Sequence, residues 1–187
     1  MPAPRHLDTP AKVAGLIGRL RRLYVVGRSA LIMLDQPNMF DVFDDWGFDQ
    51  YAQLSTPRLD GTSHGTPLYE TLQDVTARLT DYGPDFERST LAGLLVTVGD
   101  ACSQNGYFDR TPALELLRHL RNASGHGNAF NLLNGEPRLT AEYRGFSISS
   151  ADHGRADVLF TFIGAGDVLN LLSNVENHLR EIEGRWS

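Results

Sequence analysis

Residues 111–128 read TPALELLRHLRNASGHGN, and this stretch predicts a helix with a marked start and a marked end. Thr111 suits the N-cap position, and Pro112 suits the first helical position because its missing N–H costs nothing there. Gly125 favours termination, so we expect the helix to span about residues 112–124. Its inward face would be formed by Leu114, Leu117 and Leu120.

The same signals recur on both sides of this stretch: a threonine–proline start and an apolar stripe at helical spacing. Threonine–proline pairs open helices at residues 9–10 and 66–67, and a glycine–proline pair at 83–84 would end the second of these. Besides 112–124, the helices predicted in this way span about residues 10–34, 68–82, 85–103 and 167–183.

Between residues 141 and 163 the helical spacing of apolar residues gives way to short segments typical of strands. The segments 143–148 and 158–163 are rich in aromatic and branched residues, and a turn-like stretch at 150–154 separates them. We therefore expect one β-hairpin over about residues 141–163. Residues 53–65 are polar and rich in proline and glycine, so they predict a loop.

Together these segments predict a mainly α protein, an antiparallel helical bundle with one small β-hairpin, folded as a single domain over residues 1–187. Of the 187 residues 41% are hydrophobic, which is enough for an ordinary core. The formal net charge of −6 argues against a protein that coats nucleic acid, and no DNA partner is expected. Any nucleic-acid site must be a local patch.

The composition also excludes several kinds of site. A single cysteine, Cys102, allows neither an internal disulfide nor a zinc clamp of the CxxC type. Four aspartates lie between residues 41 and 49, but without the glycine-turned loop of a calcium site they predict a solvated acidic face. We therefore expect no metal and no cofactor. The sequence has neither an apolar run of membrane-spanning length nor a signal peptide, which favours a cytoplasmic protein without membrane contact.

Two short motifs match known patterns but lack their context. Residues 61–65, GTSHG, fit the GxSxG nucleophile elbow, yet no buried strand precedes them. Residues 164–166, GAG, could open a dinucleotide-binding turn, but Leu169 replaces the third glycine and Asp167 would repel a pyrophosphate. A loop and a helix cap explain these two motifs better.

The chemistry-bearing side chains are concentrated in residues 117–128. Arginines hold phosphate oxygens with fixed donors, histidines transfer protons near neutral pH, and an asparagine orients either. Residues 109–126 carry a net charge of +1 in a chain of −6, so this patch is local. Its members are Arg118, His119, Arg121, Asn122 and His126.

Arg121 and His126 are five positions apart, about 140° around a regular helix, so an unbroken helix would not direct both at one atom. Two arrangements resolve this. Either the helix ends at Gly125 and His126 turns back toward Arg121, or each residue meets its counterpart from a second subunit across a two-fold axis.

Residues 121–126, RNASGH, resemble the RxxxxH motif of the HEPN superfamily, with the polar residue directly after the arginine that many members carry. The longer stretch 117–128 is similar to a plasmid- and prophage-associated branch in which a short strand pair and a C-terminal helix beginning with Gly-Asp follow, as at residues 166–167. The resemblance covers about residues 85–183. It implies a helical homodimer, a metal-independent ribonuclease in toxin–antitoxin or defence systems, and an antitoxin or nucleotidyltransferase as partner protein.

The resemblance also assigns roles. It makes Arg121 the phosphate-binding residue, His126 the acid–base residue and Asn122 the orienting neighbour, with Arg118 and Asn128 as further RNA contacts. RNA would be cleaved by attack of the 2′-hydroxyl on the adjacent phosphate, giving a 2′,3′-cyclic phosphate. The alternative is a catalytically inactive HEPN-like dimer that binds RNA, a nucleotide or a protein through the same groove. His119 and His178 are expected to be packing or surface residues.

Overall fold

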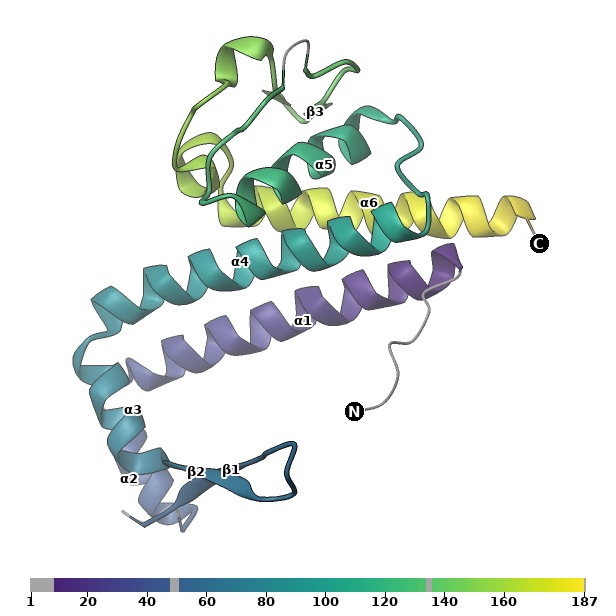
Figure 1. Ribbon diagram of the computed structural model, residues 1–187. Coiled ribbons are helices and arrows are strands. Elements are labelled where there is room, and N and C mark those ends of the chain that lie inside the picture. The colour runs from purple at the N-terminus through teal and green to yellow at the C-terminus, as the bar shows by residue number, and fades with distance from the viewer. Residues whose placement is uncertain (1–8, 48–50, 134–135, 187) are drawn as a thin grey trace. The chain divides into compact units, whose positions relative to one another are not determined.

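The computed structural model describes residues 9–47, 51–133 and 136–186 (Figure 1). Where the sequence predicted one domain, the contacts among these residues divide the chain into two compact units. Unit 1 comprises residues 25–86, and unit 2 comprises residues 9–24 and 87–186. Two long helices, α1 (Pro10–Leu34) and α4 (Leu79–Gln104), contribute residues to both units.

Helix α1 covers the residues predicted from its apolar spacing. The carbonyl oxygen of Thr9 accepts hydrogen bonds from the N–H groups of Lys12 (3.1 Å) and Val13 (3.3 Å). The Thr9 hydroxyl oxygen also lies 3.3 Å from the Lys12 nitrogen, so Thr9 caps the helix with both its backbone and its side chain. The buried apolar side chains of this helix are Val13, Ala14, Ile17, Tyr24 and Leu34.

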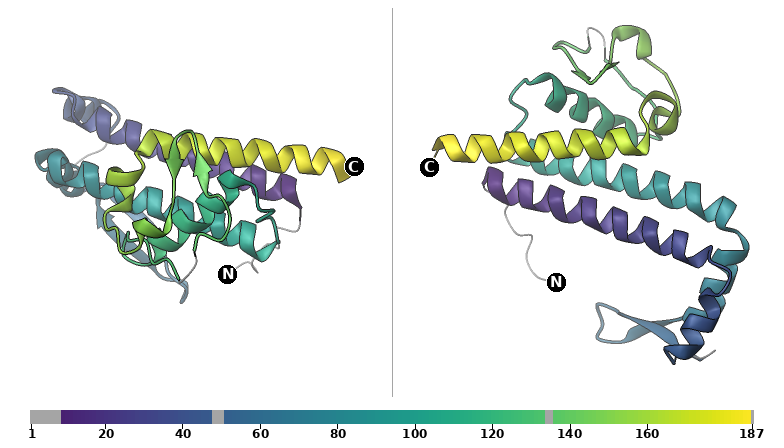
Figure 2. Two further views of the ribbon diagram at one scale, coloured as in Figure 1. Left: turned by 90° about the horizontal axis from the view of Figure 1, so that it is seen from above. Right: turned by 180° about the vertical axis from the view of Figure 1, so that it is seen from behind.

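Most of the hydrophobic core lies in unit 2. In this unit α5 (Pro112–Gly125) packs against α6 (Ala165–Trp186), and the ribbons of α1, α4 and α6 run alongside one another in both Figures 1 and 2. Burying a leucine or isoleucine side chain contributes about 1.5–3 kcal/mol, so this core dominates the stability of the unit. Fully buried side chains include Ile17, Leu91, Leu95, Leu114, Leu116, Leu117, Leu120, Leu171 and Leu172.

The break between α3 (Leu68–Ala77) and α4 falls earlier than the sequence predicted. The glycine–proline pair does not end a helix: Pro84 lies inside α4, and the break is at Arg78, which has a non-helical φ of −129°. At this position the proline removes one N–H from the helix ladder and crowds the carbonyl of Thr80, but the helix continues through it. The Arg78 side chain spans the break, donating to Asp74 Oδ1 (3.0 Å) and to the Tyr82 hydroxyl (2.9 Å).

The predicted loop over residues 53–65 is instead part of an antiparallel hairpin in unit 1. Strand β1 (Gln53–Pro57) pairs with β2 (Ser63–Pro67), and nearly all of their residues are exposed. A strand without a buried face shows no alternation of apolar and polar residues, so no pattern in the sequence indicated these two strands. The short helix α2 (Met39–Asp45) also belongs to this unit.

The hairpin predicted over about residues 141–163 is wrong in its pairing. Strand β3 (Glu142–Tyr143) pairs with β4 (Phe146–Ser147), so the hairpin closes inside the first expected strand. Arg144 and Gly145 have φ values of 47° and 90°, the two positive values that a tight two-residue turn requires.

The second expected strand of that hairpin is an irregular turn. Residues 158–162 form this turn, η2 (Val158–Phe162), in which Leu159 and Phe160 have non-helical backbone angles, and a short 3₁₀ turn, η1 (Ser150–Asp152), precedes it. Aromatic and branched residues made this segment resemble a strand, but the chain turns at Phe160, which has a φ of 80°, and within the turn only Val158 and Leu159 are buried.

The described chain is therefore mainly α-helical, with two separate two-stranded antiparallel sheets. No helix within the described residues combines the length and the apolar character that crossing a bilayer requires.

Candidate active site

Arg121 lies on α5, and the stem of its side chain packs closely against α4. A Cβ atom built on Gly99 of α4 would lie 2.5 Å from Cγ and 2.7 Å from Cβ of Arg121. Any larger residue at position 99 would collide with the arginine stem. Gly99 therefore lets Arg121 cross the surface of α4 and directs its guanidinium toward the next residue of that helix.

That next residue is Asp100, which holds the guanidinium. Nε of Arg121 donates to Asp100 Oδ1 at 2.8 Å, and Nη2 donates to the same oxygen. On the other side, Nη1 donates to Asn122 Oδ1 at 3.0 Å. The Arg121 and Asp100 side chains are 36% and 38% exposed, so the group is fixed in orientation but accessible from solvent.

His126 stands at the end of the same helix. Helix α5 ends at Gly125, as predicted, and His126 is its C-cap residue, with its N–H donating to the carbonyl of Ala123 (3.1 Å). The His126 side chain is exposed. Among the described residues, Arg121, Asn122 and Asp100 are joined by hydrogen bonds, and no such bond joins His126 to them. The structure thus unites part of the predicted motif and leaves its histidine at the surface.

Asn128 has a structural role next to the motif. Its backbone N–H donates to the Ala123 carbonyl (2.8 Å), and its side-chain oxygen accepts from the N–H of Leu159 (2.8 Å). Its carbonyl oxygen accepts from the N–H of Val158 (3.0 Å). Asn128 therefore fastens the η2 turn to the end of α5. The predicted RNA contact would have to use the side-chain Nδ2, which is buried and has no hydrogen-bond partner in the described part of the chain.

Arg118 is held in a separate polar cluster on α5. It donates to Glu115 Oε1 through Nε (3.1 Å) and Nη2 (2.7 Å), and to Glu136 Oε1 through both terminal nitrogens (3.3 Å each). The Glu115 side chain is only 7% exposed. These contacts tie the segment around Glu136 to α5. The role predicted for Arg118, contact with RNA, would require this cluster to open.

His119 belongs to the same cluster and is buried. Its Nε2 lies 3.0 Å from Nη2 of Arg118, and its side chain is 2% exposed. Burial first, and the neighbouring Arg118 second, lower the pKa of His119 below its ordinary value. His119 is therefore neutral near pH 7, where it can accept a hydrogen bond from Arg118.

His178 is paired with a carboxylate away from the motif. Its Nε2 lies 2.5 Å from Asp109 Oδ2, which links α6 to the turn that precedes α5. Burial would raise the pKa of the Asp109 carboxyl, but hydrogen bonds from Thr111 and His178 outweigh this and hold it below its usual range. This geometry gives His178 a tethering contact.

The other sequence motifs do not form sites in the described chain. Cys102 is fully buried, and burial, with a smaller contribution from Asp109, raises the pKa of its thiol to about 12, so it is not a nucleophile. Ser63, from the GTSHG motif, lies on the exposed strand β2 and not on a buried strand-to-helix turn. No group of three or more potential metal ligands occurs within the residues that the structure describes.

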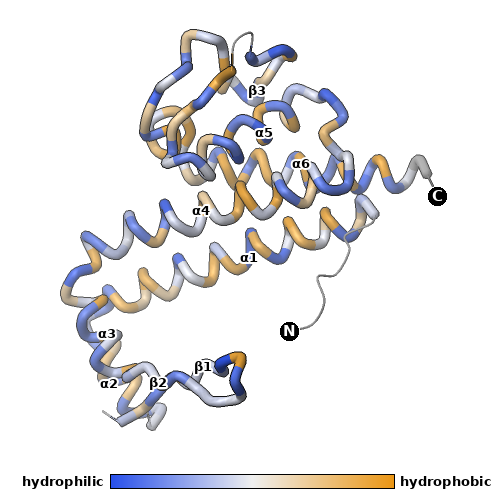
Figure 3. The backbone as a smooth tube through the Cα atoms, viewed as in Figure 1, coloured by the Kyte–Doolittle hydropathy of each residue, from blue (hydrophilic) through white to orange (hydrophobic). Residues whose placement is uncertain are grey.

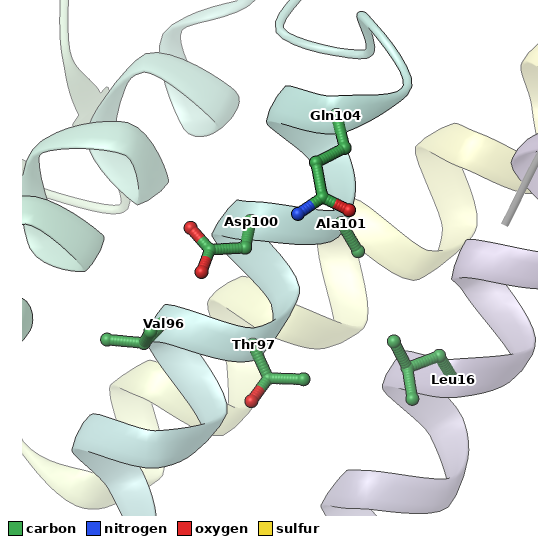
Figure 4. A pocket seen from close by; sticks show the side chains of 6 residues that line it. All are labelled: Leu16, Val96, Thr97, Asp100, Ala101 and Gln104. Atoms are coloured by element: carbon green, nitrogen blue, oxygen red, sulfur yellow. The ribbon is translucent and has the colours of Figure 1, made fainter. Parts of the chain in front are cut away.

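Sequence reasoning missed Gly99 and Asp100. One signal was present: Gly99 lies on the buried stripe of α4, where a glycine costs helix stability and so suggests a close contact. The pairing of Asp100 with Arg121, 21 positions away, had no local signal. Asp100 also lies at the edge of a shallow pocket of about 290 Å³ in unit 2 (Figure 4). That pocket is lined by Leu16, Val96, Thr97, Asp100, Ala101 and Gln104.

Comparisons with protein-family models, with curated proteins and with solved structures found no match to this chain.

Proposed function

We propose that the chain is a HEPN-like protein that cleaves RNA without a metal ion, with Arg121 and His126 as its catalytic residues. The observation that supports this most strongly is the fixed guanidinium of Arg121, held by Asp100 and Asn122 at the accessible end of α5, five residues before an exposed histidine. Phosphate recognition uses this kind of fixed, accessible arginine.

The contacts of Arg121 leave donors for a phosphate. A guanidinium has five N–H donors, and the bonds from Nε, Nη2 and Nη1 use three of them. One N–H on each terminal nitrogen remains, and these two can donate to two phosphate oxygens. Asp100 therefore positions the guanidinium without exhausting its donors, and Asn122 orients the opposite side.

The proposed reaction needs only these side chains. His126 takes the proton from the ribose 2′-hydroxyl, and the 2′-oxygen attacks the adjacent phosphorus. The bond to the 5′-oxygen breaks, and that oxygen takes the proton that His126 has accepted, so that a 2′,3′-cyclic phosphate and a 5′-hydroxyl end result and His126 is neutral again. Arg121 stabilises the negative charge on the non-bridging oxygens as it develops.

We further propose that two copies of the chain meet at the end of α5. His126 makes no hydrogen bond to Arg121 in the described chain, so a second copy could supply the histidine that faces each guanidinium. Sedimentation velocity at micromolar concentration tests this, because a strictly monomeric protein would contradict the arrangement.

A second function is favoured by one specific observation, the presence of the Asp100 carboxylate against Arg121. A carboxylate there neutralises part of the charge on the guanidinium, which weakens its stabilisation of the negative charge that develops during cleavage, while two N–H donors still remain for a bound phosphate. On this basis the same groove would bind RNA or a nucleotide and would not cleave it.

One experiment separates the two functions. Fluorescently labelled RNA is incubated with the wild-type protein and with Arg121→Ala and His126→Ala, with and without EDTA. Exposed residues outside the motif, Arg88 on α4 and His64 on β2, provide the matched controls Arg88→Ala and His64→Ala. His119 is buried and His178 is paired with a carboxylate, which makes them poor controls, whereas the contact of His64 is an exposed hydrogen bond with Arg58.

For the ribonuclease we expect cleavage that resists EDTA, yields cyclic phosphate ends and is lost by about 100-fold or more in both motif variants but in neither control. Binding without cleavage, lost in Arg121→Ala alone, would establish the binding module instead. Neither binding nor cleavage by the folded wild-type protein would overturn both proposals.

A further inference from the structure

The part of α1 that belongs to unit 1 is apolar on two opposite faces. One face is covered within the unit: Leu34 is buried, and a Cβ built on Gly27 would lie 2.6 Å from Cζ of Phe86 on α4. Because a glycine is needed for this close approach, α1 and α4 are in direct contact along this face.

The opposite face of the same segment is exposed. Val25, Val26, Ile32 and Met33 are each 48–65% exposed, and their positions fall within an arc of about 120° around the helix. Arg28 is the single charged residue between positions 25 and 34. Ser29 is a polar residue inside this arc. Apolar side chains that gather on an exposed helix face mark an interaction surface, so this face is expected to be covered by something outside unit 1.

Unit 1 as a whole buries little apolar surface. Of the 30 buried apolar side chains in the described chain, two lie between residues 25 and 86, whereas eight of the twelve large exposed ones lie there. In Figure 3 the α1 backbone over this stretch is coloured mostly as hydrophobic. Within unit 1, the described residues therefore leave this apolar face of α1 uncovered.

The charge of unit 1 decides what can cover this face. Residues 25–86 contain ten acidic and three basic residues, a net charge of −7, while the rest of the chain has 13 acidic and 14 basic residues. The acidic excess of the protein is thus confined to unit 1. Two copies meeting through this face would bring two charges of −7 together, which is unfavourable, whereas a basic partner would be attracted.

We propose that the face of α1 formed by Val25, Val26, Ile32 and Met33 is a docking surface for a basic amphipathic helix of another protein. The spacing i, i+1, i+7, i+8 matches what a helix packed alongside α1 would contact. Apolar side chains of the partner would cover this face, and its flanking lysines or arginines would lie in the field of the acidic unit. The proposal does not depend on the activity proposed for Arg121 and His126.

The test uses two synthetic helical peptides of about three heptads, with leucine at every a and d position. The remaining positions are lysine-rich in one peptide and glutamate-rich in the other. Binding to the full-length protein is measured by fluorescence anisotropy at low and high salt. The variant Val26→Ser/Ile32→Ser removes apolar contacts from the face, and Leu59→Ser, at an 87% exposed position of the same unit, is the matched control.

We expect the lysine peptide to bind at least about tenfold more tightly than the glutamate peptide and to bind less tightly at high salt. The double variant should weaken binding by about tenfold or more, and Leu59→Ser should leave it unchanged. Circular dichroism confirms that each variant is folded. Equal binding of the two peptides, or binding unaffected by the double variant, would overturn the proposal. So would a dimer of this chain that the double variant dissociates, since a second copy would then be the occupant.

Discussion

Two arginines on consecutive turns of α5 are held in opposite ways. Arg118 donates to two carboxylates, Glu115 and Glu136, and contacts a buried histidine. Arg121 donates to one half-exposed carboxylate, Asp100, and to its neighbour Asn122. Both residues are arginines on the same helix, so the difference between them comes from the side chains around each one. Removing Arg118 would leave the buried carboxylate of Glu115 without this cation, whereas removing Arg121 would leave the more exposed carboxylate of Asp100 without its partner.

The largest expected effect concerns Arg121. Arg121→Ala should reduce RNA cleavage by about 100-fold or more, because the developing phosphate charge loses its donors. The same change should alter the free energy of unfolding by less than about 1 kcal/mol, because an ion pair this exposed contributes little. Cleavage rates and urea denaturation measure the two quantities. A large loss of stability with little loss of cleavage would reverse the roles assigned to the two arginines.

Arg118→Ala should show the opposite balance. Glu115 would be left buried without its cation, which costs about 2 kcal/mol in unfolding free energy. Cleavage by the folded variant should remain within a few-fold of the wild type. A normal urea midpoint for this variant would show that the buried cluster is not stabilising.

Gly99 tests whether the approach of the two helices positions Arg121. Gly99→Ala places a methyl group less than 3 Å from the arginine stem and should destabilise the protein by about 1–2 kcal/mol while displacing the guanidinium. On the same helix, a Cβ at Gly93 meets no atom within 4 Å, so Gly93→Ala should stabilise the protein by about 0.5–1 kcal/mol. If both variants changed the melting temperature alike, the close contact with Arg121 would not be what requires glycine at position 99.

The smallest effect is a pH dependence from His119. In the unfolded chain this histidine takes up a proton near pH 6.5, whereas the folded protein keeps it neutral to lower pH. Stability from this residue is therefore present above about pH 6.5 and is lost as the pH falls, with a slope of at most about 1.4 kcal/mol per pH unit. Denaturation between pH 7 and 5 should show a weaker slope in His119→Gln. Carboxylates with lowered pKa values, such as Glu136, change the stability with pH only below about pH 4.5, so they do not contribute to this slope.

Local patterns predicted those parts of the fold that bury one face. The helices α1, α5 and α6 were found because their apolar residues recur at helical spacing, and α1 and α5 also carry a threonine–proline start. The β1–β2 hairpin was missed because it buries neither face. The η2 turn was mistaken for a strand because aromatic and branched residues there pack around a turn with positive φ, which a propensity for strands does not reveal.

In the candidate site, too, the sequence predicted local features and missed a contact between two helices. Arg121, Asn122 and His126 could be proposed because they are close in sequence, and α5 does end where the glycine indicated. Asp100 could not, since its partnership with Arg121 depends on how two helices pack. Asn128 and Arg118 show what closeness in sequence does not reveal: both make contacts that serve the fold, and the RNA contacts expected of them stay predictions.

Local hydrogen bonds close the turn between β1 and β2. Thr62 donates to Asp60 Oδ1 from its N–H (2.9 Å) and its hydroxyl (2.7 Å), and Gly61 has a φ of 85°. Leu59, at the tip of this turn, is 87% exposed. In evolutionary terms the tip is a place where the chain can gain or lose residues at little cost, because the bonds that close it are local. In the laboratory it is accordingly a position to insert a peptide tag, in a different unit from both arginine clusters.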